Sequence, residues 1–113
     1  MSFTIDKAAC ADKVLPALRE SAPEMVALRH QIHAHPELAY EEFATSDLVA
    51  ARLAQWGYEV HRGLGGTGVV GTLRLGSGAR RLGLRADMGA LPVQEGTGLP
   101  YASTVPGKMH ACG

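Results

Sequence analysis

The chain has 113 residues, a length that fits one small domain or part of a larger one. Hydrophobic residues make up 46% and charged residues 19%, as in ordinary soluble globular proteins. Eleven Lys and Arg balance eleven Asp and Glu, which argues against a nucleic-acid-binding or membrane-binding role.

The N-terminal residues do not resemble a targeting segment. Charges at Asp6, Lys7, Asp12 and Lys13 interrupt any apolar stretch, and no apolar run is long enough to span a bilayer. We therefore expect a cytoplasmic protein. In that compartment a disulfide between Cys10 and Cys112 is disfavoured, and neither cysteine belongs to the C-x-x-C motif of redox proteins.

A first helix is expected from residues 21–24, where Ser, Pro and Glu form a capping-box pattern. Apolar residues then recur at three- and four-residue spacing over 25–32. Pro36 disfavours helical geometry at His35, so the helix should end there.

A second helix is expected from Glu41 to Trp56. Acidic residues occupy its first turn, where they suit the helix dipole, and Val49 and Leu53 lie on one apolar face. Gly57 suits the left-handed conformation that closes many helices.

Beyond Gly57 the pattern changes to short β-rich runs separated by glycine turns, and the end of the chain is rich in Gly and Pro. The expected elements are strands over 58–62, 67–75 and 80–86, turns over 63–66 and 76–78, and loop over 87–113. Helices followed by strands predict an α/β domain. The strands are few, and only the helices before residue 57 are available to cover them, whereas a parallel α/β sheet needs helices on both faces. This indicates an incomplete architecture.

The run from Gly63 to Gly68 matches G-x-G-x-x-G, the dinucleotide-binding pattern. That pattern binds a nucleotide only where it leads from a strand into a helix. A β-rich segment follows here, so we interpret the glycines as a strand-to-strand turn.

Three further groups are candidate sites. His30, His33 and His35 could bind a metal, but their place at the end of an amphipathic helix favours a structural role. Asp87 follows an apolar strand, where α/β sheets build sites, yet a solvated Asp near an Arg fits equally well. His110 and Cys112 are both good ligands for zinc-like metals, although two ligands do not complete a shell.

Several motifs, taken in order, resemble the hippurate hydrolase, N-acyl-amino-acid amidohydrolase and auxin-conjugate hydrolase branch of the aminoacylase and carboxypeptidase metallopeptidases. The resemblance covers about residues 25 to 113. The motifs are His33-Ala34-His35-Pro36-Glu37-Leu38, Gly65-Gly66-Thr67-Gly68-Val69-Val70-Gly71, Leu84-Arg85-Ala86-Asp87-Met88, Ala90-Leu91-Pro92-Val93-Gln94-Glu95, Thr97-Gly98-Leu99-Pro100-Tyr101 and Met109-His110-Ala111-Cys112-Gly113.

The resemblance implies metal-dependent hydrolysis of the amide bond of N-acyl amino acids. It implies two divalent metal ions in the complete enzyme, of manganese, zinc, cobalt or nickel. Cys112 would be a metal ligand, and Asp87 would lie beside the metals and orient a ligand. Gly89 stands where the family usually has Asp, which removes one carboxylate near the site.

The resemblance also implies a domain organisation. Residues 1–113 would form the N-terminal part of a catalytic α/β domain, ending within the metal-binding motif, with the lid domain that often mediates homodimerisation absent. The family's general base and remaining ligands lie further along, so we expect the chain alone to be inactive. The alternative is a non-enzymatic remnant or an interaction protein.

Overall fold

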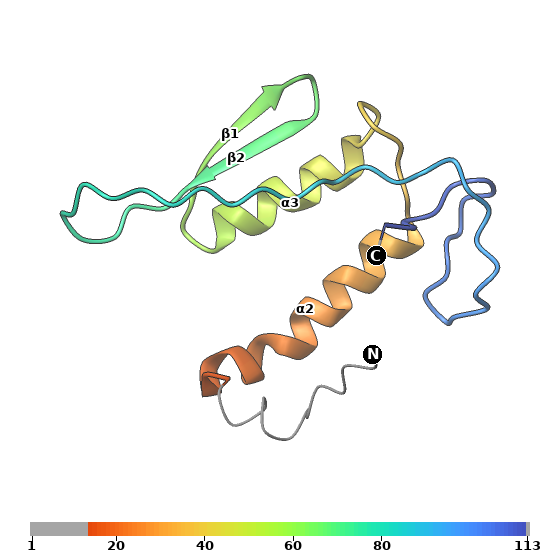
Figure 1. Ribbon diagram of the computed structural model, residues 1–113, viewed down its shortest axis with the longest axis horizontal. Helices are drawn as coiled ribbons and strands as arrows, with labels where there is room; N and C mark the ends of the chain where they lie inside the picture. The colour runs from red at the N-terminus through yellow and green to blue at the C-terminus, as the bar shows by residue number, and fades with distance from the viewer. Residues whose placement is uncertain (1–13, 113) are drawn as a thin grey trace, which may run out of the picture.

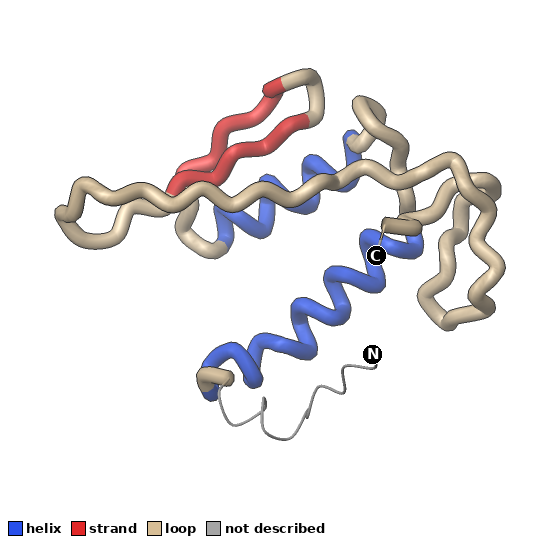
Figure 2. The backbone as a smooth tube through the Cα atoms, viewed as in Figure 1, coloured by secondary structure: helices blue, strands red, loops and turns tan. Residues whose placement is uncertain are grey.

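The computed structural model describes residues 14–112, and these form two helices followed by a two-stranded hairpin. The hairpin lies on one helix, while the other helix diverges from it (Figure 1). After the hairpin, a long extended segment crosses the molecule to loops at the C-terminal end of the first helix (Figure 2). The elements are α2 (Pro16–Ala34), α3 (Phe43–Gln55), β1 (Glu59–Leu64) and β2 (Gly68–Thr72).

Helix α2 begins earlier than predicted, at Pro16. A proline suits the first turn of a helix because its missing N–H would have no partner there. The predicted capping box is wrong: Ser21 lies inside the helix and its hydroxyl donates to the Leu18 carbonyl at 3.2 Å. The predicted end is confirmed, since the helix closes at Ala34, just before Pro36.

Helix α3 starts two residues after the predicted Glu41 and is capped by a side chain from outside the helix. The Glu37 carboxylate accepts hydrogen bonds from the Thr45 N–H and hydroxyl, both at 2.6 Å, and from the Ala44 N–H at 3.1 Å. These donors belong to the first turn, where backbone N–H groups lack helical partners. Gly57, with φ of 86°, follows the helix as expected.

The hairpin confirms the interpretation of the glycine-rich run. Strands β1 and β2 pair antiparallel from Glu59 opposite Thr72 to Leu64 opposite Gly68. Gly65 and Gly66 connect them with φ of 61° and 95°, a region that favours glycine. The run therefore joins two strands, and the geometry required of a dinucleotide-binding loop is not present there.

Gly68 is predicted to be the least replaceable glycine of the hairpin. A Cβ atom there would lie 2.4 Å from the Leu64 carbonyl oxygen, so Gly68→Ala must displace the backbone. We expect it to lower the free energy of unfolding by about 1–3 kcal/mol in urea titrations. Gly78→Ala is the control, because its Cβ would meet nothing within 4 Å. Equal stability of the two variants would contradict the steric argument.

The predicted strand over 80–86 is wrong as a strand. The segment is extended, but it pairs with no strand among the described residues. Leu82 and Leu84 are 85% and 90% exposed. A strand needs hydrogen-bonded neighbours for its backbone N–H and C=O groups, and no strand within residues 14–112 pairs with this segment. The loop predicted after residue 87 is confirmed up to residue 112, apart from isolated bridges at Ala90 and between Leu91 and Met109.

The described residues contain a sparse core. Ala50, Ala90 and Pro36 are the buried apolar residues among residues 14–112, and the buried polar residues are Glu42, Thr45, Ser46 and Thr67. Many large apolar side chains are exposed on the helices and on the extended segment. The incomplete α/β architecture expected from the sequence is thus visible as uncovered apolar surface. No helix within residues 14–112 is both long and apolar enough to cross a membrane.

Candidate functional site

A groove of about 900 Å³ is lined by residues of the two helices, the hairpin and the extended segment. Its walls are mainly apolar, and polar lining residues come from both helices, the extended segment and the C-terminal residues. Asp87, His110 and Cys112 all line it, together with His33 from α2. The groove therefore brings together the two residues that the sequence singled out as site residues.

Asp87 lies at the end of the extended segment. Its Oδ1 accepts a hydrogen bond from the Gly89 N–H at 2.9 Å, and its Oδ2 lies 3.5 Å from a guanidinium nitrogen of Arg85. The Gly89 hydrogen bond, helped by Arg85, outweighs partial desolvation and lowers the pKa of Asp87 below its usual value. The carboxylate is thus held ionised, with one oxygen oriented by the main chain.

The position of Gly89 shows how little space a side chain would have. A Cβ atom there would lie 3.3 Å from Oε1 of Glu42 and 3.4 Å from Oδ1 of Asp87. An aspartate at this position would place a third carboxylate beside two others. Gly89 therefore lowers the density of negative charge next to Asp87.

Cys112 is an exposed free thiol. Two residues before it, His110 has a buried Nε2 with no hydrogen-bond partner in residues 14–112. Burial, with a contribution from nearby His33, lowers the pKa of His110, which favours the neutral imidazole. Cys10 lies outside the described residues, so its pairing with Cys112 is not described.

The donor set suits part of a metal centre. A thiol and an imidazole match a zinc-like ion, and the orphaned His110 Nε2 shows an unmet polar requirement beside Cys112. However, no group of three His, Cys, Asp or Glu side chains in residues 14–112 is arranged to hold a metal ion. The described residues thus fit one edge of a metal site rather than a closed shell.

The three helix-end histidines each have a different partner. His30 stacks on the Tyr101 ring with 3.7 Å between centroids, and His35 Nδ1 donates to the Gln31 carbonyl at 2.8 Å. His33 Nε2 donates to Glu95 Oε1 at 2.7 Å. These contacts agree with the structural role favoured from the sequence.

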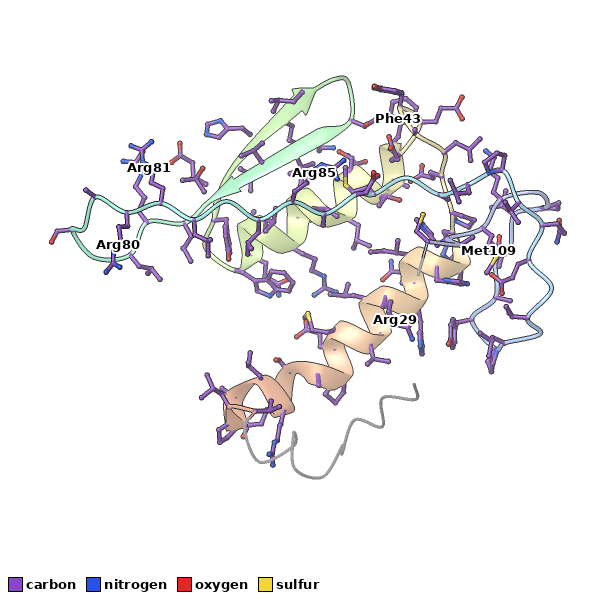
Figure 3. The ribbon with its side chains drawn as sticks, viewed as in Figure 1. Arg29, Phe43, Arg80, Arg81, Arg85 and Met109 are labelled. Carbon is purple, nitrogen blue, oxygen red and sulfur yellow. The ribbon has the colours of Figure 1, made fainter. Side chains whose placement is uncertain are left out.

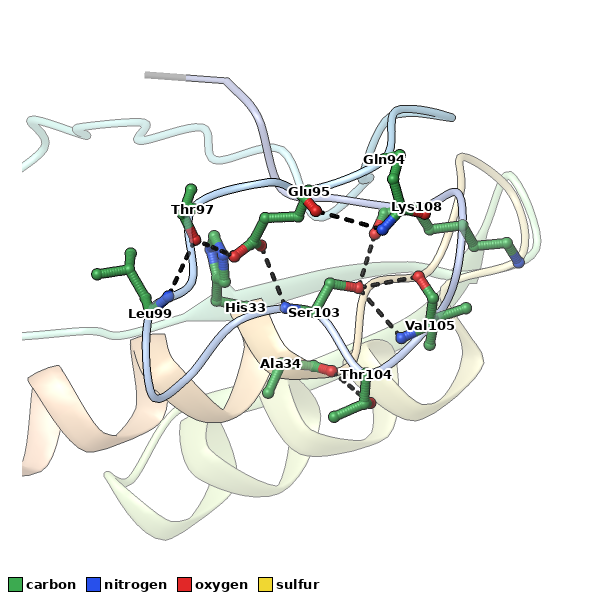
Figure 4. Close-up of polar contacts among 10 residues, drawn as sticks. All are labelled: His33, Ala34, Gln94, Glu95, Thr97, Leu99, Ser103, Thr104, Val105 and Lys108. Carbon is green, nitrogen blue, oxygen red and sulfur yellow. Dashed lines mark hydrogen bonds and ion pairs between the residues drawn. The ribbon is translucent and has the colours of Figure 1, made fainter.

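No role was predicted for Glu95 from the sequence, yet its carboxylate holds together the loop that contains Thr97 and Ser103 (Figure 4). Its side chain is 3% exposed and accepts hydrogen bonds from His33, the Thr97 hydroxyl and the Ser103 N–H. Hydrogen bonding, first from Thr97, outweighs desolvation and lowers the pKa of Glu95. Thr104 adds two hydrogen bonds to the Ala34 carbonyl, at 2.9 and 2.7 Å. The loop is therefore fastened to the C-terminal end of α2 by polar contacts.

Comparison with known proteins gives a consistent result, although no protein-family model matched the chain. The chain is 49% identical to hippurate hydrolase of Campylobacter jejuni over 88% of its own length and 26% of that protein. It is 46% identical to thermostable carboxypeptidase 1 of Saccharolobus solfataricus, over 90% and 26% of the two chains. It is 47% identical to an IAA-amino acid hydrolase of Arabidopsis thaliana, over 79% and 20%.

The fold agrees with the sequence matches. The Bacillus subtilis YxeP protein, a dinuclear metal binding peptidase from the M20 family, superposes with a TM-score of 0.77 at 34% identity. The superposition covers 83% of this chain and 26% of that protein. The resemblance to the hippurate hydrolase and auxin-conjugate hydrolase branch of the M20 metallopeptidases is thereby confirmed. The similar proteins are hydrolases and peptidases by name, and the chain spans about a quarter of their length.

Proposed function

We propose that this chain forms the N-terminal part of the catalytic domain of a metal-dependent amidohydrolase acting on N-acyl amino acids. The observation that carries the proposal is that Asp87 and Cys112 line the same groove. The chain that forms this groove is 49% identical to hippurate hydrolase of Campylobacter jejuni. We further propose a cytoplasmic location and, for the complete enzyme, a homodimer. The alternative is a non-enzymatic interaction protein, which the uncovered apolar surface favours.

In this proposal Cys112 binds a divalent metal ion as a thiolate, since its sulfur is exposed and has no partner among residues 14–112. Asp87, held ionised by the Gly89 N–H, orients a neighbouring ligand or balances local charge. When bound, the two metal ions would polarise the scissile carbonyl and lower the pKa of water. Manganese, zinc, cobalt and nickel are all compatible with a site of this mixed chemistry.

The chain alone is expected to be inactive, since one thiolate cannot complete the shell of a catalytic metal. A direct assay with hippurate and each of the four metals checks this expectation. The proposed activity itself is best tested in a chimeric protein in which this chain replaces the matching quarter of the Campylobacter hippurate hydrolase. Metal-dependent hippurate hydrolysis by the chimeric protein would support the proposal, and a folded but inactive protein would favour the non-enzymatic alternative.

Asp87 is predicted to affect catalysis in that chimeric protein without being required for folding. Asp87→Asn keeps the shape and can still accept the Gly89 hydrogen bond, but it removes the charge. We expect kcat/KM or metal affinity to fall by about 10–100-fold, the range for groups that orient metal ligands. Asp47→Asn, another exposed aspartate paired with an arginine, is the control. Equal effects of both changes would contradict a specific role for Asp87.

A further inference from the structure

We infer that Glu95 is a positioning residue for Cys112, and that its carboxylate sets how strongly the Cys112 thiolate binds a divalent metal ion. Glu95 acts through two neighbours, His33 of α2 and Ser103 of the loop that precedes Cys112, and touches neither the metal ion nor the substrate. This inference rests on the proposed function for the presence of a metal ion, but its readout is metal binding rather than hydrolysis.

The Glu95 carboxylate is almost fully removed from water, since its side chain is 3% exposed. Its Oε1 accepts hydrogen bonds from His33 Nε2 at 2.7 Å and from the Ser103 N–H at 3.1 Å, and its Oε2 accepts one from the Thr97 hydroxyl. A buried carboxylate is costly without such donors, and hydrogen bonds to a charged group are strong and directional. One oxygen atom thus holds a helix residue and a loop residue in a fixed relation (Figure 4).

Ser103 connects this carboxylate to the segment that ends at Cys112. The Ser103 N–H binds Glu95, and the Ser103 hydroxyl donates to the Lys108 carbonyl at 2.7 Å. Lys108 lies four positions before Cys112 in the sequence. The position of Glu95 is therefore transmitted to the thiol by two hydrogen bonds and a short stretch of main chain.

His33 connects the same carboxylate to α2. This histidine lies in the last turn of the helix and lines the groove together with Cys112. Its ring centroid lies 6.3 Å from that of His110, two residues before Cys112. Figure 3 shows Met109 beside the C-terminal end of α2, in agreement with that distance. The Glu95 carboxylate thus fixes the end of α2 against the segment that carries the thiol.

The loop also has hydrogen bonds that do not involve Glu95. The Gly107 N–H donates to Gln94 Oε1 at 2.7 Å, and Thr104 donates twice to the Ala34 carbonyl. Loss of the Glu95 carboxylate should therefore displace the loop without unfolding it. A displaced ligand binds its metal ion more weakly, because the geometry that the ion prefers is no longer met. The effect expected of Glu95 is hence on metal affinity.

The experiment measures the Kd of the chimeric hydrolase for Zn²⁺ by competition with a chromophoric chelator. Glu95→Ala is expected to raise this Kd by about 10–100-fold, the range for groups that orient metal ligands. Glu95→Gln keeps an oxygen to which His33 and Ser103 can donate, so it should restore most of the lost affinity. Glu59→Ala is the matched control, because Glu59 also pairs with a histidine, at 3.4 Å, but is 62% exposed on the hairpin.

Circular dichroism and the Tm, both measured without metal, show whether each variant is folded. Weaker Zn²⁺ binding by folded Glu95→Ala, recovered in Glu95→Gln, would support the inference. Equal Kd values for Glu95→Ala and Glu59→Ala, or no recovery in Glu95→Gln, would overturn it. If Glu95→Ala does not fold, His33→Ala decides by the same measurement, because it removes the helix side of the connection alone. A wild-type chimeric protein that binds no Zn²⁺ would overturn the proposed function itself, and this inference with it.

Discussion

In the chimeric hydrolase, Cys112→Ala is expected to lower kcat/KM by about a thousandfold or more. The physical reason is the loss of a ligand whose negative charge and softness match a zinc-like ion. Cys112 is exposed and has no structural partner in the described chain, so its removal should leave folding intact. Activity with hippurate and metal content by elemental analysis are the two measurements.

Two controls separate ligand loss from other effects. Cys10→Ala removes the other thiol of the chain and should leave activity unchanged. Cys112→Ser preserves size but supplies a poorer ligand, so metal content should fall with activity. Lost activity with full metal content would show that Cys112 acts in some other way, and retained activity would refute the ligand assignment.

The second large effect is expected on stability, at Glu37. Glu37→Ala removes the carboxylate that accepts three hydrogen bonds at the start of α3. We expect the free energy of unfolding at pH 7 to fall by about 1–2 kcal/mol, the range for a helix cap with solvent screening. Glu41→Ala is the matched control, because Glu41 is exposed and should cost less than about 0.5 kcal/mol.

The same residue predicts a pH dependence. Partial burial opposes ionisation of Glu37, but hydrogen bonds from Thr45, Ala44 and Phe43 outweigh it and lower the pKa below 4.5. A carboxyl group with a depressed pKa stabilises the folded state fully above its unfolded pKa and loses this contribution as the pH falls through the folded pKa. Urea titrations of the wild type and Glu37→Ala should therefore converge below pH 4.5. If the stability difference between the two proteins stayed constant down to pH 2.5, which is ~2 units below the usual glutamate pKa, this account would be contradicted.

Features set by neighbouring residues were predicted well from the sequence. Pro36 marks the end of α2, and the glycines after Leu64 turn the chain back into β2. The strand over 80–86 was predicted wrongly in its pairing because a strand depends on partners that residues 14–112 do not supply. Period-2 alternation reports which faces a segment presents, and it carries no information about hydrogen-bonded neighbours.

The polar contacts missed by sequence reasoning are long-range. Glu95 meets His33 across 62 residues of sequence, and no local pattern signals such a pair. Glu37 caps a helix that it does not belong to, whereas sequence rules look for the cap immediately before the first turn. In the candidate site, the motifs led to Asp87 and Cys112. The buried, unpartnered nitrogen of His110 became evident only from the packing around it.

The loop fastened by Glu95 also determines how firmly the segment before Cys112 is held. Met109 pairs with Leu91 through hydrogen bonds of 2.9 and 3.0 Å, and the Ser103 hydroxyl donates to the Lys108 carbonyl at 2.7 Å. The segment leading to Cys112 is thus already held in place by hydrogen bonds, although the apolar core is sparse. Binding of a metal ion at Cys112 therefore does not include the entropic cost of ordering this segment, so the thiol is preorganised.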